Sequence, residues 1–375
     1  MFSSNKKSRL NKIFLLLLLS SILLLAGCTR APVRGWSGPI VSDNVLYVGS
    51  IIGKVLALDL LEIQDNQPEV KWEKPLESPG AGGFLACSTR VSTPMSTYGT
   101  PAIGGDKVYV GGYDGHIYSI RIDDQSMNQF DTGSAIVGGP IVADGTIFVG
   151  NSDGKFYALN LDLSPEPKWV FNTGDKIWST PAVDNGVVYI GSSDHKLYAI
   201  DIESGEEIWH FETQGAILST PLVVDGTIYI GSCDNNFYAI DAATEEERRA
   251  ATAREKGDPI PSREAKWVFD EAGNWFWTKA LFYNDEIWVG CLDHKVYALN
   301  AEGGEKAWEY ETGGRVCTPP VFMDNLDIIL VGSEDGNVYA IDAQEKSSHV
   351  LYSFDAPVLA PLYADQEKGI LYVHA

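Results

Sequence analysis

Hydrophobic residues in this chain recur in short runs that are separated by turn residues. In the clearest stretch, residues 179–212, the runs are rich in β-branched and aromatic residues, and Asp184-Asn185-Gly186 and Ser204-Gly205 lie between them. Asn-Gly and Asp-Gly favour tight hairpin turns, because such turns need positive φ. We therefore predict an antiparallel meander of four short strands, at residues 179–183, 187–192, 196–201 and 207–212.

This four-strand sequence pattern recurs about every forty residues along the chain, which is typical of repeat architectures. The second and third predicted strands of a repeat are apolar on both faces, so each sheet must be covered on both sides. Stacking the copies around an axis achieves this and leaves few exposed edges. The aligned repeat positions are Gly49, Gly111, Gly150, Gly191, Gly231, Gly290, Gly332 and, irregularly, His374.

These features predict an all-β fold, a β-propeller of four-stranded antiparallel blades. We predict eight blades; the alternative is seven blades plus an extra hairpin, because the last repeat supplies only its first two strands. Inserts interrupt the repeats at residues 77–100, which are rich in Gly, Ser and Thr, and at residues 242–265. The first is predicted to be a loop, and the second to form a short helix before Pro259. Each insert is either a binding loop or a solvated decoration.

The first residues are predicted to be a targeting segment rather than part of the fold. A stretch with four basic residues precedes an apolar stretch, residues 13–25, that is short for a membrane span. The sequence Leu25-Ala26-Gly27-Cys28 resembles the bacterial lipoprotein signal, which implies cleavage before Cys28 and lipidation of its sulfur. An ordinary secretory signal or an uncleaved anchor is the alternative. The expected organisation is a signal peptide at 1–27, a short tether at 28–34 and a single propeller domain at 35–375.

Lipidation at Cys28 would place the protein on the cell membrane or the outer membrane, facing the periplasm or the exterior. The formal net charge is −23, and the loss of residues 1–27 removes four further positive charges. Such an acidic chain is a poor partner for nucleic acid or for anionic lipid headgroups. We therefore expect contact with the membrane through the lipid anchor, and no binding of nucleic acid.

A second recurring motif is a predicted strand that contains a Trp and is followed by Thr-Gly. A Thr-Pro or Gly-Pro dipeptide then opens the next repeat. Examples are Trp169 to Gly174 and Trp308 to Gly313, with starts at Pro140, Pro181, Pro221 and Pro319. The whole phrase resembles the pyrroloquinoline-quinone-like (PQQ-like) propeller repeat family over essentially all of residues 35–375. In some relatives of that family, the quinone-dependent dehydrogenases, the resemblance implies a quinone, a calcium ion and a catalytic Asp. By size, anchor and repeat, the chain is more similar to the BamB-like lipoproteins, outer-membrane assembly factors whose role is to hold partner proteins.

Candidate catalytic residues repeat too often to be catalytic. An Asp follows the repeat glycine in six blades, and a residue present in every copy is structural, since Asp caps tight turns. His195 and His294 stand where other repeats have Gly, and we expect them to be turn residues with positive φ. We predict no catalytic residue, no metal site and no cofactor. The six aspartates are Asp114, Asp153, Asp194, Asp234, Asp293 and Asp335.

The predicted function is therefore a non-enzymatic scaffold that binds other proteins of the cell envelope. One alternative is a small quinone-dependent dehydrogenase, and another is an extracellular propeller that binds a carbohydrate or other ligand.

The sixth repeat departs from the others at its start. Where other blades read Ser-Thr-Pro, this one reads Thr278-Lys279-Ala280, and two Trp residues precede it. Trp275 and Trp277 are predicted to alternate on one strand face. Aromatic residues are enriched at interaction hot spots, although such a pair can also serve blade packing. The candidate interaction surface is Trp275, Phe276, Trp277 and Lys279. The pairing of Cys87, Cys233, Cys291 and Cys317 is left open.

Overall fold

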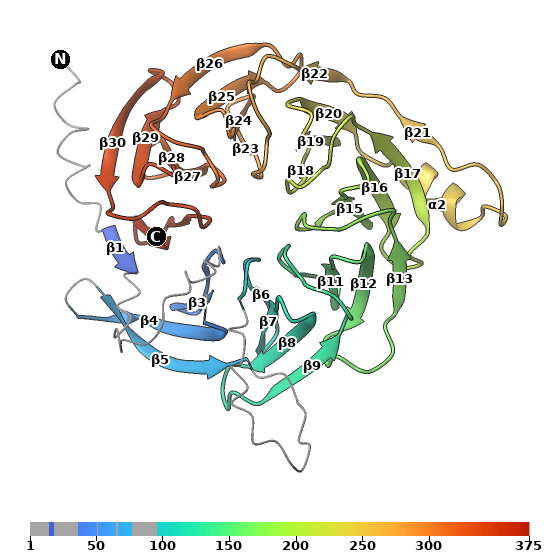
Figure 1. Cartoon of the computed structure of the whole chain (residues 1–375), viewed down its shortest axis with the longest axis horizontal. Helices are drawn as coiled ribbons and strands as arrows, with labels where there is room; N and C mark the ends of the chain where they lie inside the picture. Colours follow the sequence, from blue (N-terminus) through green and yellow to red (C-terminus); the bar gives the residue numbers. More distant parts are fainter. Residues whose placement is uncertain (1–14, 19–36, 51, 65–66, 77–95, 375) are drawn as a thin grey trace, which may run out of the picture.

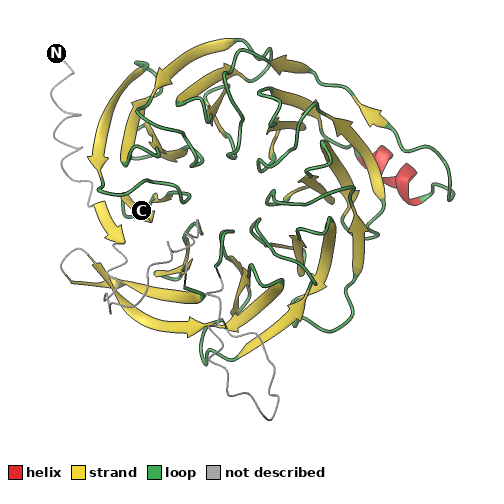
Figure 2. Cartoon of the chain, in the orientation of Figure 1, coloured by secondary structure: helices red, strands yellow, loops and turns green. Residues whose placement is uncertain are grey.

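Each repeat folds into a small antiparallel sheet, and the sheets stand radially around a central axis (Figure 1). The computed structural model describes residues 15–18, 37–50, 52–64, 67–76 and 96–374. The first strand of each sheet lies nearest the axis and the fourth lies on the outer rim (Figure 1). Strands and turns make up almost all of the described chain, and one helix projects from the rim (Figure 2).

Seven sheets contain the four strands of a complete blade. From the axis outward, the first three blades are β2 (Ile40–Ser42), β3 (Val45–Gly49), β4 (Lys54–Gln64) and β5 (Gln67–Pro75); β6 (Ala102–Gly104), β7 (Lys107–Gly111), β8 (His116–Arg121) and β9 (Met127–Asp131); and β10 (Ile141–Ala143), β11 (Thr146–Gly150), β12 (Lys155–Asn160) and β13 (Trp169–Asn172). The fourth and fifth blades are β14 (Ala182–Asp184), β15 (Val187–Gly191), β16 (Lys196–Asp201) and β17 (Glu207–Glu212); and β18 (Leu222–Val224), β19 (Thr227–Gly231), β20 (Phe237–Asp241) and β22 (Trp267–Phe269). The sixth and seventh are β23 (Leu281–Tyr283), β24 (Glu286–Gly290), β25 (Lys295–Asn300) and β26 (Lys306–Glu311); and β27 (Val321–Met323), β28 (Ile328–Gly332), β29 (Asn337–Asp342) and β30 (Ser347–Ser353).

A hairpin of β31 (Tyr363–Asp365) and β32 (Ile370–His374) fills the sector between the seventh and first blades. Leu371 and Val373 pack against the seventh blade, and Tyr372 packs against the first. The prediction of eight four-stranded blades is therefore wrong, and the alternative of seven blades plus a hairpin is supported. The physical reason is that the last repeat supplies only two inner strands.

The third position of this last sheet is taken by β1 (Leu15–Leu18), which pairs in parallel with β32. β1 lies within the segment that we predict to be cleaved as a signal peptide. Removal of residues 1–27 would leave the hairpin without this strand.

The turn chemistry read from the sequence is present in the structure. Asn185 and Gly186 have φ values of 47° and 77°, as a tight hairpin turn requires. His195 and His294 both have φ of 74°, so the prediction that they are turn residues is confirmed. β16 and β17 have the bounds that the sequence predicted, and β15 ends one residue earlier.

Hydrophobic clusters lie between neighbouring blades rather than within one of them. Between the fourth and fifth blades, for example, Tyr189 and Leu197 pack in one cluster with Ile228 and Ile240. All four side chains are fully buried, so the second and third strands of these two blades are covered on both faces. This arrangement accounts for the two-sided apolar strands seen in the sequence.

The repeat glycine at the end of each second strand is in close contact with the linker that leads to the next blade. A Cβ built on Gly191 would overlap Cγ2 of Ile217, which precedes the fifth blade. A larger residue would therefore push the two blades apart. The other equivalent pairs that adjoin an apolar linker residue are Gly111 with Ile136, Gly150 with Ile177, Gly231 with Phe276, Gly290 with Val316, and Gly332 with Val358.

We expect Gly191→Ala to lower the free energy of unfolding by about 1–3 kcal/mol, because an extra methyl group in a packed core forces neighbours out of place. Ile217→Ala should cost about 2–5 kcal/mol through the cavity that it leaves. In the double variant the new methyl group fills part of that cavity, so the two costs should sum to more than the measured loss. Urea unfolding followed by Trp fluorescence gives all three values. Strictly additive costs would show that the two residues do not form this contact.

Candidate functional site

The repeating aspartates bind the protein itself. In the fourth blade, the Tyr198 hydroxyl and the Gly174 N–H donate to Oδ2 of Asp194 over 2.7 and 2.6 Å. The Lys196 N–H donates to Oδ1 over 3.1 Å. Gly174 belongs to the linker from the third blade, so one carboxylate joins two neighbouring blades. We call this arrangement the Asp–Tyr latch.

The latch is repeated in other blades. Asp234, Asp293 and Asp335 accept a Tyr hydroxyl from their own blade and a backbone N–H from the preceding linker. Asp114 likewise accepts the hydroxyl of Tyr118, over 2.5 Å. At Asp153 the role passes to Asn151, whose Oδ1 accepts the N–H groups of Asp153 and Lys155. These contacts give the carboxylates of Asp114, Asp194, Asp234, Asp293 and Asp335 a structural role, and Asp153 is the exception.

Electrostatics of the latch favour an ionised carboxylate beside a neutral phenol. Burial raises the pKa of Tyr198 and of Tyr297 well above the usual range, and the hydrogen bond to the neighbouring Asp raises it further. At Asp335, burial acts to raise the pKa, but hydrogen bonds from Tyr339, Asn337 and Ser333 outweigh it, and the pKa is lowered. Such a carboxylate is already saturated with donors, which is a poor starting point for a general base.

A cavity of about 320 Å³ lies where the blades meet around the axis. Its walls come from residues just before the innermost strands, which surround the centre of the ring in Figure 1. Backbone and small or neutral side chains form most of the wall, and the aromatic rings of Tyr98, Trp178 and Trp277 contribute apolar surface. Lys279 is the charged residue among the described lining residues.

The candidate interaction surface of the sixth blade is divided between three environments. Residues 274–280 form an irregular linker, so the predicted strand with alternating Trp residues is wrong. Trp275 is 43% exposed, whereas Phe276 is fully buried and packs on Phe237 and Tyr297. Trp277 and Lys279 line the axial cavity. The linker is irregular because the close approach of Phe276 to Gly231 sets its path.

The axial cavity itself was missed by sequence reasoning, because it is built from positions about forty residues apart in the chain. The sequence signal that could have located the cavity is the residue two positions before the first strand of each blade. This residue is neutral in the other blades and is Lys279 in the sixth.

A family model described as "Outer membrane protein assembly factor BamB" matches residues 25–169, 164–274 and 267–357. The chain belongs to this BamB-like family of PQQ-like propellers. BamB from Moraxella catarrhalis has a similar crystal structure, with a TM-score of 0.59, 21% sequence identity and 80% of each chain covered. A computationally designed protein, Ika8, matches with a TM-score of 0.67 at 15% identity, covering 91% of this chain and 96% of its own. A comparison with curated proteins gave no match.

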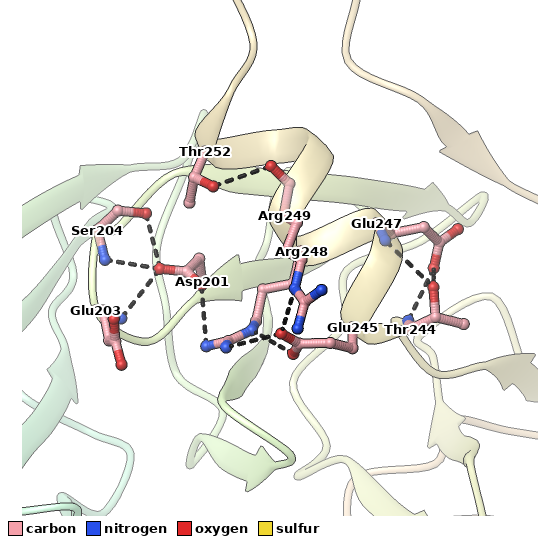
Figure 3. A network of polar contacts seen from close by, with 9 residues as sticks. All are labelled: Asp201, Glu203, Ser204, Thr244, Glu245, Glu247, Arg248, Arg249 and Thr252. Atoms are coloured by element: carbon pink, nitrogen blue, oxygen red, sulfur yellow. Dashed lines mark hydrogen bonds and ion pairs between the residues drawn. The ribbon is translucent and has the colours of Figure 1, made fainter.

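The second insert of this BamB-like chain is docked on the neighbouring blade. The expected helix is present as α2 (Glu245–Thr252), and Thr244 and Glu247 form a capping box at its start (Figure 3). Arg248 reaches Asp201 of the fourth blade over 3.4 Å (Figure 3). Arg254 donates to the backbone carbonyls of Glu207 and Ile208 in β17.

After α2, the insert adds a short strand, β21 (Ser262–Arg263), in parallel to the outer edge of the fourth blade at β17. Arg263 forms an ion pair with Glu247 over 2.7 Å, and its guanidinium lies 5.0 Å from the centre of the Trp209 ring. The insert therefore covers an edge strand that would otherwise present unpaired backbone groups. The first insert lies outside the described residues between 77 and 95.

Cys233, Cys291 and Cys317 are free thiols. Burial raises the pKa of Cys233 and of Cys317 to about 11, so both stay protonated and poorly reactive near neutral pH. Cys28 and Cys87 lie outside the described residues. Among the residues that the structure covers, no helix is long and apolar enough to span a membrane.

We expect Tyr297→Phe to lower the free energy of unfolding by about 1.5–3 kcal/mol, because it removes a donor from the buried side of the Asp293 carboxylate. The bond that is lost measures 2.6 Å. Tyr352→Phe is the matched control, since Tyr352 is 37% exposed on β30. Chemical unfolding of the two variants and the parent protein measures the difference. Equal stability of the two variants would mean that the latch contributes nothing.

Proposed function

We infer that the protein is a lipid-anchored scaffold of the cell envelope, which holds partner proteins at a membrane and catalyses no reaction. The observation that carries this proposal is the family model of the assembly factor BamB, which matches most of the chain in three overlapping segments. The similarity to the BamB crystal structure supports the fold on which such a role would rest.

The proposed absence of catalysis is supported by the state of the recurring carboxylates. Each latched Asp already accepts a Tyr hydroxyl and backbone N–H groups, as at Asp293. Moving a proton to or from such a group would break contacts that join two blades. A quinone-dependent dehydrogenase would need a singular acid that is free of such bonds, and the repeated aspartates do not supply one.

The proposed anchor is supported by the lipoprotein-like sequence that ends at Cys28 and by the apolar stretch before it. Two or more acyl chains hold a protein stably on a bilayer, whereas one chain does not. The tether of residues 28–34 would keep the propeller within roughly 25 Å of the membrane face. An envelope location is therefore proposed through this anchor.

Cys28→Ser should abolish incorporation of labelled palmitate and release the protein from the membrane fraction. The expected mass of the mature parent protein is that of residues 28–375 plus its acyl chains, read by intact-protein mass spectrometry. Cys87→Ser is the control and should leave both label and fractionation unchanged. An unlabelled parent protein that still begins at Met1 would contradict the anchor.

Trp275 is the proposed contact residue for a partner protein, because a large exposed aromatic side chain is typical of interaction hot spots. A photo-crosslinking amino acid at position 275 should capture a defined envelope protein in cells. The control position is 350 on β30, where Val350 is exposed to a similar extent, 46%.

Trp275→Ala should then weaken binding of the purified partner by roughly tenfold or more, which corresponds to about 1.4 kcal/mol or more. Surface plasmon resonance with both purified proteins measures the affinity. Identical crosslinks from positions 275 and 350, or an unchanged affinity, would contradict a binding role for Trp275.

A further inference from the structure

The residue two positions before the first strand contributes to the wall of the axial cavity in the second to seventh blades and in the terminal hairpin. These wall positions are Thr100, Gly139, Thr180, Thr220, Lys279, Pro319 and Pro361. All are neutral except Lys279, which is exposed to the cavity. One ammonium group therefore stands among neutral groups in a space that several water molecules could fill, since a water takes about 30 Å³.

The fold does not need a lysine at this position. Thr180 and Thr220 occupy it in the fourth and fifth blades, and the neighbouring hydroxyls of Ser179 and Ser219 bond to the ends of β15 and β19. In the sixth blade, Thr278 takes the place of the Ser, and its Oγ1 donates to the Gly290 carbonyl over a longer distance of 3.5 Å. The change of charge occurs at Lys279, which lies at the cavity wall.

Lys279 also differs in its partners from several other lysines in the described part of the chain. Lys295 and Lys306 both form ion pairs with Glu309, over 2.9 and 3.0 Å. Among the described residues, no carboxylate lies within ion-pair distance of Lys279. The atoms around the cavity mouth lower its pKa by partly desolvating the charged form, although the side chain stays exposed to the cavity. A cation that lacks a carboxylate partner in a confined site favours an anionic ligand.

The other lining groups indicate what kind of anion fits. Trp178 and Trp277 present apolar rings, and Tyr98 and Leu218 extend that apolar surface. Thr180 accepts the Gly139 N–H at 2.9 Å, which leaves its hydroxyl hydrogen available as a donor. A single ammonium with a few hydroxyls matches one negative charge, whereas phosphate is usually held by several cations or by an Arg fork. Cavities of this size hold small organic ligands.

We propose that the axial cavity binds a small organic monocarboxylate, with the Lys279 ammonium as its charge partner and the Trp178 and Trp277 rings as walls for its apolar body. The site is independent of the proposed scaffold role, because it lies at the axis and does not use the exposed Trp275.

Benzoate is the probe, because it joins one carboxylate to a flat apolar ring. Titration calorimetry with the full chain should show saturable binding at one site. Lys279→Met, which keeps the length of the side chain and removes its charge, should weaken binding by roughly tenfold or more, because it removes the charge partner of the carboxylate. Benzyl alcohol, the neutral counterpart of benzoate, should bind the parent protein at least as weakly as benzoate binds this variant.

The controls separate loss of the site from loss of the fold. Lys155→Met removes an exposed lysine at the start of β12 and should bind benzoate as the parent does. Lys279→Thr restores the residue found at this position in the fourth and fifth blades, so it should fold normally and still lose binding. Circular dichroism and the melting temperature verify folding of each variant.

A second readout follows the ammonium group itself. After reductive methylation with a ¹³C label, the Lys279 resonance is assigned by its absence in Lys279→Thr. Bound benzoate should raise the pKa of this group, because a nearby anion stabilises the charged form. The proposal is overturned by a parent protein that shows no saturable benzoate binding, by equal affinity of the parent and Lys279→Met, or by a Lys279 pKa that benzoate does not move.

Discussion

The ring depends on the contact between a glycine and the linker that follows it in space. Where Gly191 ends a second strand, Ile217 of the next linker lies so close that a single methyl group would not fit. This contact fixes how closely two blades approach. The Asp–Tyr latch acts on the same linker from the other side, since Asp234 of the fifth blade accepts the Gln214 N–H of that linker as well as the Tyr238 hydroxyl. Steric fit and hydrogen bonding therefore specify the same spacing, and consistency of this kind favours one folded arrangement.

The cavity and the closure of the ring both follow from that spacing. The linkers converge just before the innermost strands, and the gap that they leave is the axial cavity. In the last sector the spacing is kept by a two-stranded hairpin, which packs on both neighbours through Leu371 and Tyr372. In complete blades the outer strand also contributes to the clusters between blades, as Trp209 and Phe211 of β17 do. In the last sector the two strands of the hairpin make these contacts on both sides.

Turn residues and local hydrophobic patterns predicted most strands of a blade. The number of complete blades and the path of residues 274–280 depend on contacts between distant parts of the chain. The bounds of β16 and β17 could be predicted because turn residues with positive φ flank them, and His195 shows that even an unusual turn residue was identified by its repeat position. The number of complete blades could not be predicted, since it depends on whether two inner strands suffice to fill a sector. The path of residues 274–280 was also wrong, because burial of Phe276 against Gly231 overrides the alternation suggested by Trp275 and Trp277.

Comparison of equivalent positions among the repeats helps to separate residues with a structural role from residues with a functional one. A residue that recurs in most copies, such as the latched Asp, is explained by contacts that recur with it. A residue that breaks the pattern without breaking those contacts needs another explanation. Lys279 fits that description, because Thr278 preserves the local hydrogen bond while the ammonium faces the cavity. A ligand of opposite charge would give this ammonium a charge partner that the described side chains do not supply. The same comparison among copies applies to any propeller in which one blade differs from the others at the axis.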